Sequence, residues 1–335
     1  SLAVAVGLAL AVGAAAAGAV ALGPPPAGAA TPARLGAAIV DRLAENPAAV
    51  RAYWTRARMR AARPPGLLVR AARAAGAARQ PRHLAVRPDR GVSRRAQLAK
   101  PVRKLRRLPT RAHGKVFFSA GADQYECSGT AVRAPSRSLV LTAAHCAYLT
   151  ELLGSSNAVH NWIFVPAYAN GRAPFGKWAA TSLAAPAGWI DSDPVIGPAG
   201  EVTGGDSRFD LGAATVAAHP GGKLQAKVGG TRVAFRRPRR HRYVAFGYPA
   251  ERPYSGQREF SCSSLYLGAD PAFGHPPPIK IRCDMTAGAS GGGWVDTRGR
   301  LVSVTSYGYS NDPRSLYGPY FGTALRAFYG SVSGG

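Results

Sequence analysis

The charged residues of this 335-residue chain are distributed so unevenly that only its last two thirds can build a hydrophobic core. Residues 1–30 carry no charge at all. Residues 31–115 hold 22 Lys and Arg against 3 Asp and Glu, a net charge of +19. Residues 116–335 hold 21 against 14, a net charge of +7. The chain therefore has three compositional blocks, and its total charge of +26 mainly describes the middle one.

The first block has the pattern of a secretory signal. After Ser1 the chain runs through Ala, Val, Leu and Gly as far as Leu22, and the small-x-small site Ala27-Gly28-Ala29 follows three prolines. We interpret residues 1–30 as a signal peptide with its cleavage site. A retained anchor is the alternative, because such a run is long enough to span a bilayer, but Ala and Gly contribute little transfer energy. We expect a secreted, extracellular protein that meets a membrane only transiently, through this segment.

The second block, residues 31–112, is rich in Ala, Arg and Pro, with a more apolar motif at residues 53–59. Because alanine buries little surface against the entropy of ordering, we predict a pro-segment or linker that is largely disordered. The basic sites Arg94-Arg95 and 103–107 are either processing sites or solvated charge. Nucleic-acid binding is disfavoured, because no aromatic residues interleave with the arginine clusters to stack on bases.

The third block, residues 113–335, is the globular domain. Runs of strand length and β-branched or aromatic content occur at residues 116–118, 139–141, 162–165, 242–246 and 301–304. Many short strands without intervening helices indicate an all-β sandwich or barrel. One late helix is predicted, with Thr323 as N-cap, residues 324–329 as its body and Gly330 as its stop.

Four cysteines in an exported chain indicate two disulfides. Four cysteines allow three pairings, and proximity in sequence favours Cys127 with Cys146 and Cys262 with Cys283. Each bridge would close a loop of about 20 residues and stabilise the fold by ~3 kcal/mol on the chain-entropy model. A zinc site is disfavoured because neither pair has the close Cys-x-x-Cys spacing, so we expect no metal and no cofactor.

Two motifs in the third block carry nucleophilic chemistry. Leu-Thr-Ala-Ala-His-Cys at residues 141–146 follows a predicted strand, and Thr-Ala-Gly-Ala-Ser-Gly-Gly-Gly at residues 286–293 precedes another. A serine hydroxyl is a weak nucleophile near neutral pH and needs a base within hydrogen-bond reach, which His145 would provide for Ser290. Taken separately, a glycine-rich turn is more often a hairpin and an isolated histidine is more often structural.

Together the motifs resemble those of the chymotrypsin-like serine peptidases, in which Thr-Ala-Ala-His-Cys carries the catalytic base and Gly-x-Ser-Gly-Gly the nucleophile. The resemblance covers roughly Gly114 to Gly330 and implies two six-stranded antiparallel β-barrels, with a short helix at the C-terminus. It also implies an oxyanion hole made by the backbone N–H groups of Gly288 and Ser290. The expected site lies in the cleft between the barrels.

The family order His, Asp, Ser implies an aspartate between the two motifs. The candidates are Asp191, Asp193, Asp206 and Asp210. Asp210 is favoured because the apolar run that follows it would bury it at the start of a strand. Asp206 lies among glycines and Ser207, where a solvated turn is expected.

Downstream, the residues Ser306, Tyr307 and Gly308 resemble the family's substrate-backbone strand, which pairs with an extended peptide. Residues 246–250 and Cys262 resemble the secreted bacterial branch that includes the glutamyl endopeptidases. Those enzymes place a histidine just before the substrate-backbone serine. Here the residue is Thr305, which argues against specificity for glutamate.

Two further departures concern activation and specificity. Ala289 stands where the animal enzymes have an aspartate that pairs with a freed N-terminal amine, so that switch is absent. Asp284 lies six residues before Ser290, where trypsin-type enzymes place the acid that selects Arg or Lys. Because Cys283 is displaced relative to that pattern, Asp284 is either a substrate-binding residue or a surface acid beside a disulfide.

The sequence thus predicts a secreted, monomeric serine endopeptidase that is made as a zymogen and acts on protein or peptide substrates, with no nucleic-acid partner. The alternatives are a catalytically silent peptidase-like binding module, a polyanion- or cell-wall-binding protein that uses the middle block, and an esterase. The basic run Arg236–Arg242 could bind an anionic cell-wall polymer, although a solvated loop is the simpler interpretation.

Overall fold

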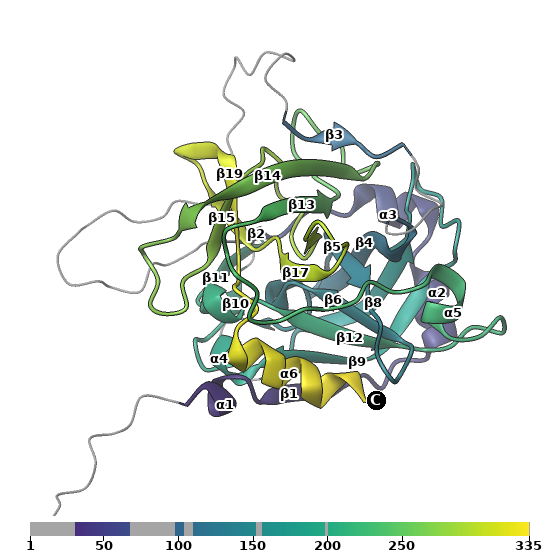
Figure 1. The fold of residues 1–335 in the computed structure, drawn as a ribbon. Coiled ribbons are helices and arrows are strands. Elements are labelled where there is room, and N and C mark those ends of the chain that lie inside the picture. The colour runs from purple at the N-terminus through teal and green to yellow at the C-terminus, as the bar shows by residue number, and fades with distance from the viewer. Residues whose placement is uncertain (1–30, 68–97, 104–109, 152–155, 198–199, 335) are drawn as a thin grey trace, which may run out of the picture. The chain divides into compact units, whose positions relative to one another are not determined.

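Short runs of β-branched and aromatic residues form two large antiparallel sheets, and these sheets dominate the fold (Figure 1). The computed structural model describes residues 31–67, 98–103, 110–151, 156–197 and 200–334. The predicted signal segment and the basic site Arg94-Arg95 lie outside the described residues. Within the described ranges, no helix is long and apolar enough to cross a membrane.

The first large sheet closes into a six-stranded barrel. Its strands, in spatial order, are β9 (Trp178–Pro186), β12 (Gly212–Val216), β6 (Leu139–Thr142), β5 (Asp123–Ala131), β4 (His113–Ala120) and β8 (Val159–Pro166). Pairing of β8 with β9 closes the ring. The strands predicted at residues 116–118, 139–141 and 162–165 are therefore confirmed, as parts of β4, β6 and β8.

The second large sheet is open and forms a half-barrel. Its strands, in spatial order, are β17 (Leu301–Val304), β16 (Gly293–Val295), β13 (Arg242–Gly247), β14 (Phe260–Ala269), β15 (Ile279–Arg282), β19 (Asp312–Gly318) and β18 (Tyr307–Tyr309). A short strand from the middle block, β3 (Lys100–Pro101), also pairs with β14. The predicted all-β class of chymotrypsin-like type is confirmed, with the second barrel built as a half-barrel.

Short elements fill the connections between these strands. A small sheet contains β2 (Gly66–Leu67), β11 (Glu201–Thr203), β10 (Val195–Ile196) and β7 (Thr150–Glu151) in that order. The helical turns are η2 (Thr110–Ala112), η3 (Ala144–Cys146), α4 (Ala187–Ile190), η4 (Ser207–Phe209) and α5 (Leu224–Val228).

The predicted disorder of residues 31–112 is wrong for residues 32–67, which fold onto the first barrel. They form α1 (Pro32–Leu35), β1 (Ala38–Arg42), α2 (Pro47–Tyr53), α3 (Arg56–Ala61) and β2. The Asn46 side chain caps α2, and β1 pairs along β9. Trp54 is fully buried and donates its indole N–H to the carbonyl of Asn161 at 2.5 Å. A few large side chains thus supply the buried surface that the alanines lack.

The predicted C-terminal helix is confirmed as α6 (Thr323–Ser333), but its ends differ from the prediction. The N-cap is Gly322, and the helix continues through Gly330. Leu325, Phe328 and Val332 recur at helical spacing and are all buried. Burial of Val332 against the core outweighs the low helix propensity of one glycine.

The predicted disulfides are both present. Cys127 bonds to Cys146 within the first barrel, and Cys262 bonds to Cys283 in the second sheet. Each bond lies in the hydrophobic core of its own sheet. Each sheet is therefore cross-linked by its own disulfide.

Three ionisable side chains are buried at the start of the first barrel. Lys115 forms an ion pair with Glu126, and burial raises the pKa of Glu126 to about 7 and lowers that of Lys115, while their mutual attraction opposes both changes. The His113 ring stacks on Phe246, and its Nδ1 lies 2.9 Å from the Thr130 hydroxyl. Burial lowers the pKa of His113 from 6.5 to about 3, so its ring is neutral in the folded protein near neutral pH.

His113 should make the fold sensitive to mild acid. Between pH 6.5 and 3 the unfolded chain binds a proton at this position and the folded chain does not, so stability falls as the pH is lowered. From pH 6.5 to 5 the expected loss is about 2 kcal/mol. His113→Gln, which cannot ionise, should show a correspondingly smaller loss in urea unfolding between pH 7 and 5. The same pH dependence in variant and wild type would contradict this.

Candidate active site

His145 is placed by a rigid turn at the end of a buried strand. The turn η3 follows β6, and the disulfide from Cys146 to Cys127 ties it to β5. The carbonyl of Cys146 also accepts a hydrogen bond from the Trp162 indole at 2.8 Å. The histidine thus lies on a turn held by a covalent bond and by a buried hydrogen bond.

Asp210 lies at the end of a second turn, η4, just before β12. The side chain of Asp206 caps η4 by accepting the N–H of Arg208, the turn role expected for it. Gly212 then lets β12 approach η3 closely, because a Cβ at this position would lie 2.7 Å from the carbonyl oxygen of Ala143. This close approach brings Asp210 next to His145.

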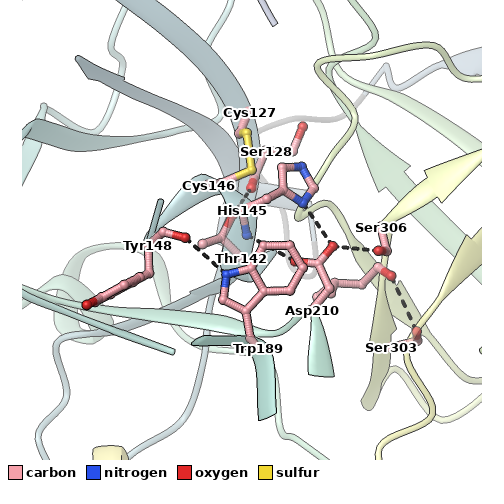
Figure 2. Close-up of polar contacts among 11 residues, drawn as sticks. Cys127, Ser128, Thr142, His145, Cys146, Tyr148, Trp189, Asp210, Ser303 and Ser306 are labelled. Carbon is pink, nitrogen blue, oxygen red and sulfur yellow. Dashed lines mark hydrogen bonds and ion pairs between the residues drawn. A yellow bond between two sulfur atoms is a disulfide. The ribbon is translucent and has the colours of Figure 1, made fainter. Parts of the chain in front are cut away.

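The carboxylate of Asp210 accepts three hydrogen bonds (Figure 2). Its Oδ2 lies 2.8 Å from His145 Nδ1 and 2.5 Å from the hydroxyl of Ser306, and its Oδ1 accepts the His145 backbone N–H at 3.0 Å. Both His145 and Asp210 are fully buried. Because a carboxylate only accepts, Nδ1 of His145 carries the proton and Nε2 is left as the acceptor. Nε2 has no hydrogen-bond partner among the described residues.

The loop that carries Ser290 needs its glycines. Gly288 and Gly291 have φ angles of +90° and +77°, in the region that favours glycine. A Cβ on Gly291 would lie 2.1 Å from the hydroxyl of Thr142, and one on Gly288 would lie 2.6 Å from the carbonyl of Tyr248. Ser290 itself is 3% exposed. The glycine-rich motif is therefore a tight loop packed against both large sheets.

Ser128 of β5 fixes this loop, a role that no sequence motif indicates. Its hydroxyl donates to the carbonyl of Gly288 at 2.8 Å and accepts the N–H of Tyr248 at 2.9 Å. Its backbone N–H donates to the carbonyl of Ser290 at 2.7 Å. Ser128 thus binds the carbonyls of both Gly288 and Ser290. Within the described chain, the N–H groups of Gly288 and Ser290 donate to no acceptor.

The predicted substrate strand lies at the edge of the second sheet. In β18, Tyr307 pairs with Tyr317 of β19, and β18 is the last strand in the sheet order, so its other edge pairs with no strand of the described residues. Ser306, just before β18, contacts Asp210, whereas Gly308 lies within the strand. Thr305 accepts a hydrogen bond from the Trp294 indole at 2.8 Å and is buried.

Asp284 has partners other than those expected of a specificity acid. Its Oδ2 accepts the backbone N–H of Leu98, and its Oδ1 accepts the N–H of Ala99, both at 2.8 Å. The hydroxyl of Tyr254 also donates to Oδ1 at 3.0 Å. The carboxylate therefore anchors the part of the middle block that leads into β3.

One group of side chains resembles a metal site by proximity. Cys127, His145 and Cys146 bring their ligand atoms within 4.8 Å of one another. The two sulfurs are bonded to each other, so neither is a thiolate ligand. In the basic run Arg236–Arg242, the residues up to His241 form a loop and Arg242 begins β13; Arg239 in this loop donates to the carbonyl of Pro277 at 2.8 Å.

Comparison with known proteins identifies the family of this chain. The sequence matches no protein-family profile and no curated protein. Among solved structures, it is similar to the protease Anisep from Arthrobacter nicotinovorans, at 36% identity and a TM-score of 0.57 over 67% of this chain and 96% of that one. It is also similar to the thermostable serine protease AL20 from an extremophilic microorganism, at 33% identity and a TM-score of 0.56 over 67% of this chain and 97% of that one.

A Glu endopeptidase solved in complex with MPD shares the fold at 20% identity, with a TM-score of 0.56 over 71% of this chain and 98% of that one. The two proteases at 36% and 33% identity are matched over nearly their whole length. This chain therefore belongs to the chymotrypsin-like serine proteases of bacteria.

Proposed function

We propose that the protein is a secreted serine endopeptidase that cleaves peptide bonds with Ser290 as nucleophile, His145 as general base and Asp210 as the group that orients the base. The observation that carries the proposal is the buried hydrogen bond between His145 and Asp210. It keeps the proton on Nδ1 of His145, and Nε2 has no partner in the described chain. A histidine held in this tautomer is ready to accept a proton from a serine hydroxyl.

The proposed reaction uses Ser290 as the nucleophile and His145 as the base. Nε2 of His145 takes the proton of the Ser290 hydroxyl as its oxygen attacks the substrate carbonyl carbon, and the carbonyl oxygen gains the negative charge. The N–H groups of Gly288 and Ser290, which donate to no acceptor in the described chain, would stabilise that charge. The imidazolium then protonates the leaving amine, and an acyl group remains on Ser290. Water, activated by His145, releases it in the reverse sequence.

Substrate would bind as an added strand. The edge of β18 that pairs with no strand of the described chain would offer backbone groups of Tyr307 and Gly308 to an extended peptide. Ser306, which donates to Asp210, joins this strand to the proposed catalytic residues. Binding of an extended main chain suits an enzyme that acts on protein or peptide substrates. Because Thr305 is bound to Trp294, it is not available to recognise an acidic side chain.

Export and activation complete the proposal. Two buried disulfides are typical of proteins that fold outside the cytosol. A neutral Ala289 precedes the nucleophile, so a freed N-terminal amine would find no carboxylate there. Cleavage of the basic middle block would therefore act by release rather than by forming a new ion pair.

Ser290→Ala should abolish peptide hydrolysis and leave the melting temperature unchanged. Loss of the nucleophile in a related system lowers kcat by about a millionfold. A fluorophosphonate probe should label the wild type at Ser290 and should label His145→Ala far more slowly. Equal labelling of both proteins would show that His145 is not the base, and near-normal hydrolysis by Ser290→Ala would support a peptidase-like binding module instead.

Ser128→Ala should reduce turnover more than its effect on stability explains. The substitution leaves the carbonyl of Gly288 and the N–H of Tyr248 without their shared partner, which should lower kcat by roughly tenfold to a hundredfold through misplaced oxyanion donors. Ser303→Ala is a matched control, because that buried hydroxyl donates to the carbonyl of Pro319 and not to the Ser290 loop. Equal kcat values for the two variants, measured at equal folded fraction, would refute the positioning role.

Asp284→Ser should change stability rather than specificity. It removes the acceptor of the Leu98 and Ala99 N–H groups, so unfolding should become easier by roughly 2 kcal/mol. The ratio of kcat/KM for matched Arg and Leu substrates should stay within about threefold of the wild-type ratio. A selective loss of the Arg substrate by orders of magnitude would instead place Asp284 in the specificity pocket.

A further inference from the structure

The outer face of β14 exposes two large apolar side chains. Leu265 and Leu267 are 57% and 51% exposed, and the less exposed Tyr266 stands between them at the start of a β-bulge. Their neighbours Cys262 and Ser264 point into the sheet's core and are buried. β14 lies between β13 and β15 in the sheet order (Figure 1), and its pairing with β13 ends at Leu265, so that Leu267 has only β15 beside it among the described strands. A solvent-facing position in a sheet usually carries a polar residue, whereas these two positions carry leucine.

Arginines flank Leu265 on both neighbouring strands. Arg242 of β13 is the register partner of Leu265. On β15, Arg282 follows Ile281, the partner of Tyr266, and its backbone N–H bonds to the hydroxyl of Ser264. Both arginine side chains are exposed. Leu265 thus lies between two cationic side chains, and Leu267 lies two residues further along β14.

The charge of this face is not neutralised by acids of the described chain. Neither Arg242 nor Arg282 forms an ion pair there, and Arg242 donates only to the hydroxyl of Ser263. The nearby acids have other partners: Asp312 pairs with Lys280, and Asp284 holds Leu98 and Ala99. The basic loop ending in Arg240 leads directly into β13 and adds further positive charge.

We propose that this face, made of Leu265, Leu267, Arg242 and Arg282, docks the protein on an anionic lipid bilayer. Arginines bind lipid phosphates, while leucines enter the boundary between headgroups and acyl chains, so a bilayer uses both halves of the face. An anionic polysaccharide would engage the arginines alone and leave the leucines in water. The proposal goes beyond peptide hydrolysis, and beyond the transient membrane contact expected of a signal segment.

Cosedimentation with vesicles tests the proposal, using phosphatidylcholine alone or mixed with phosphatidylglycerol at physiological salt. The full chain should bind the mixed vesicles more tightly than the neutral ones. Leu265→Ser/Leu267→Ser should weaken that binding about tenfold. Arg242→Gln/Arg282→Gln should weaken it about 25-fold, at roughly fivefold for each charge.

Matched controls separate this face from the charge of the whole chain. Ile39→Ser/Val40→Ser removes another exposed apolar pair, and Arg42→Gln/Arg298→Gln removes two other exposed charges. Both controls should bind within roughly twofold of the wild type. Loss of binding on the arginine substitutions but not on the leucine substitutions would identify a site for a soluble polyanion and overturn the bilayer proposal. Binding of both test variants at control level would overturn it as well.

Hydrolysis of a soluble peptide distinguishes this proposal from the proposed activity. All four variants should retain the wild-type kcat/KM, because none of the substituted residues hydrogen-bonds to His145, Asp210 or Ser290. A failure of vesicle binding with intact hydrolysis would thus refute the docking face alone.

Discussion

The buried carboxylate of Asp210 is the interaction on which the candidate active site depends. An isolated charge in a protein interior is strongly unfavourable, so it must be satisfied by hydrogen bonds from the chain around it. Here those bonds come from both halves of the protein: His145 is on the first barrel, and Ser306 leads into β18 of the second sheet. The charge that fixes the histidine tautomer therefore also fixes how the two sheets meet. Orientation of the base and packing of the halves have one physical cause.

Ser128 fixes the Ser290 loop through buried hydrogen bonds, as Asp210 fixes His145. Both carbonyls that it binds belong to the glycine-rich loop, while Ser128 itself lies on β5, next to the disulfide at Cys127. The loop can approach so closely only because Gly291 has no side chain to meet Thr142. The hydrogen bonds of Ser128 and the close approach of Gly291 to Thr142 thus set the position of the nucleophile relative to the first barrel. The glycines allow the contact, and the serine determines which way the peptide groups face.

The sequence predicts those parts of the fold and site that local patterns determine. The strands follow from short runs of β-branched and aromatic residues, and the choice of Asp210 over Asp206 follows from the apolar residues after it. Three features depend on contacts between distant segments and have no local signal. These are the role of Ser128, the anchoring of Ala99 by Asp284, and the folding of residues 32–67 around Trp54. In the last case composition misleads, because a few large side chains, Trp54 among them, pack against the barrel and supply the buried surface that the alanines lack.

The proposed attack of the Ser290 hydroxyl on the substrate, with His145 as its base, can be tested by trapping the covalent intermediate. A slowly deacylating nitrophenyl ester should give a burst of one nitrophenolate per active chain, and acid quenching during the burst should leave an acyl group that peptide mapping locates on Ser290. The burst should be fast in the wild type. In His145→Ala it should be at least about a thousandfold slower, on the order of the loss in kcat when a triad residue is removed. A full burst with the acyl group on another residue, or turnover without any covalent intermediate, would contradict it.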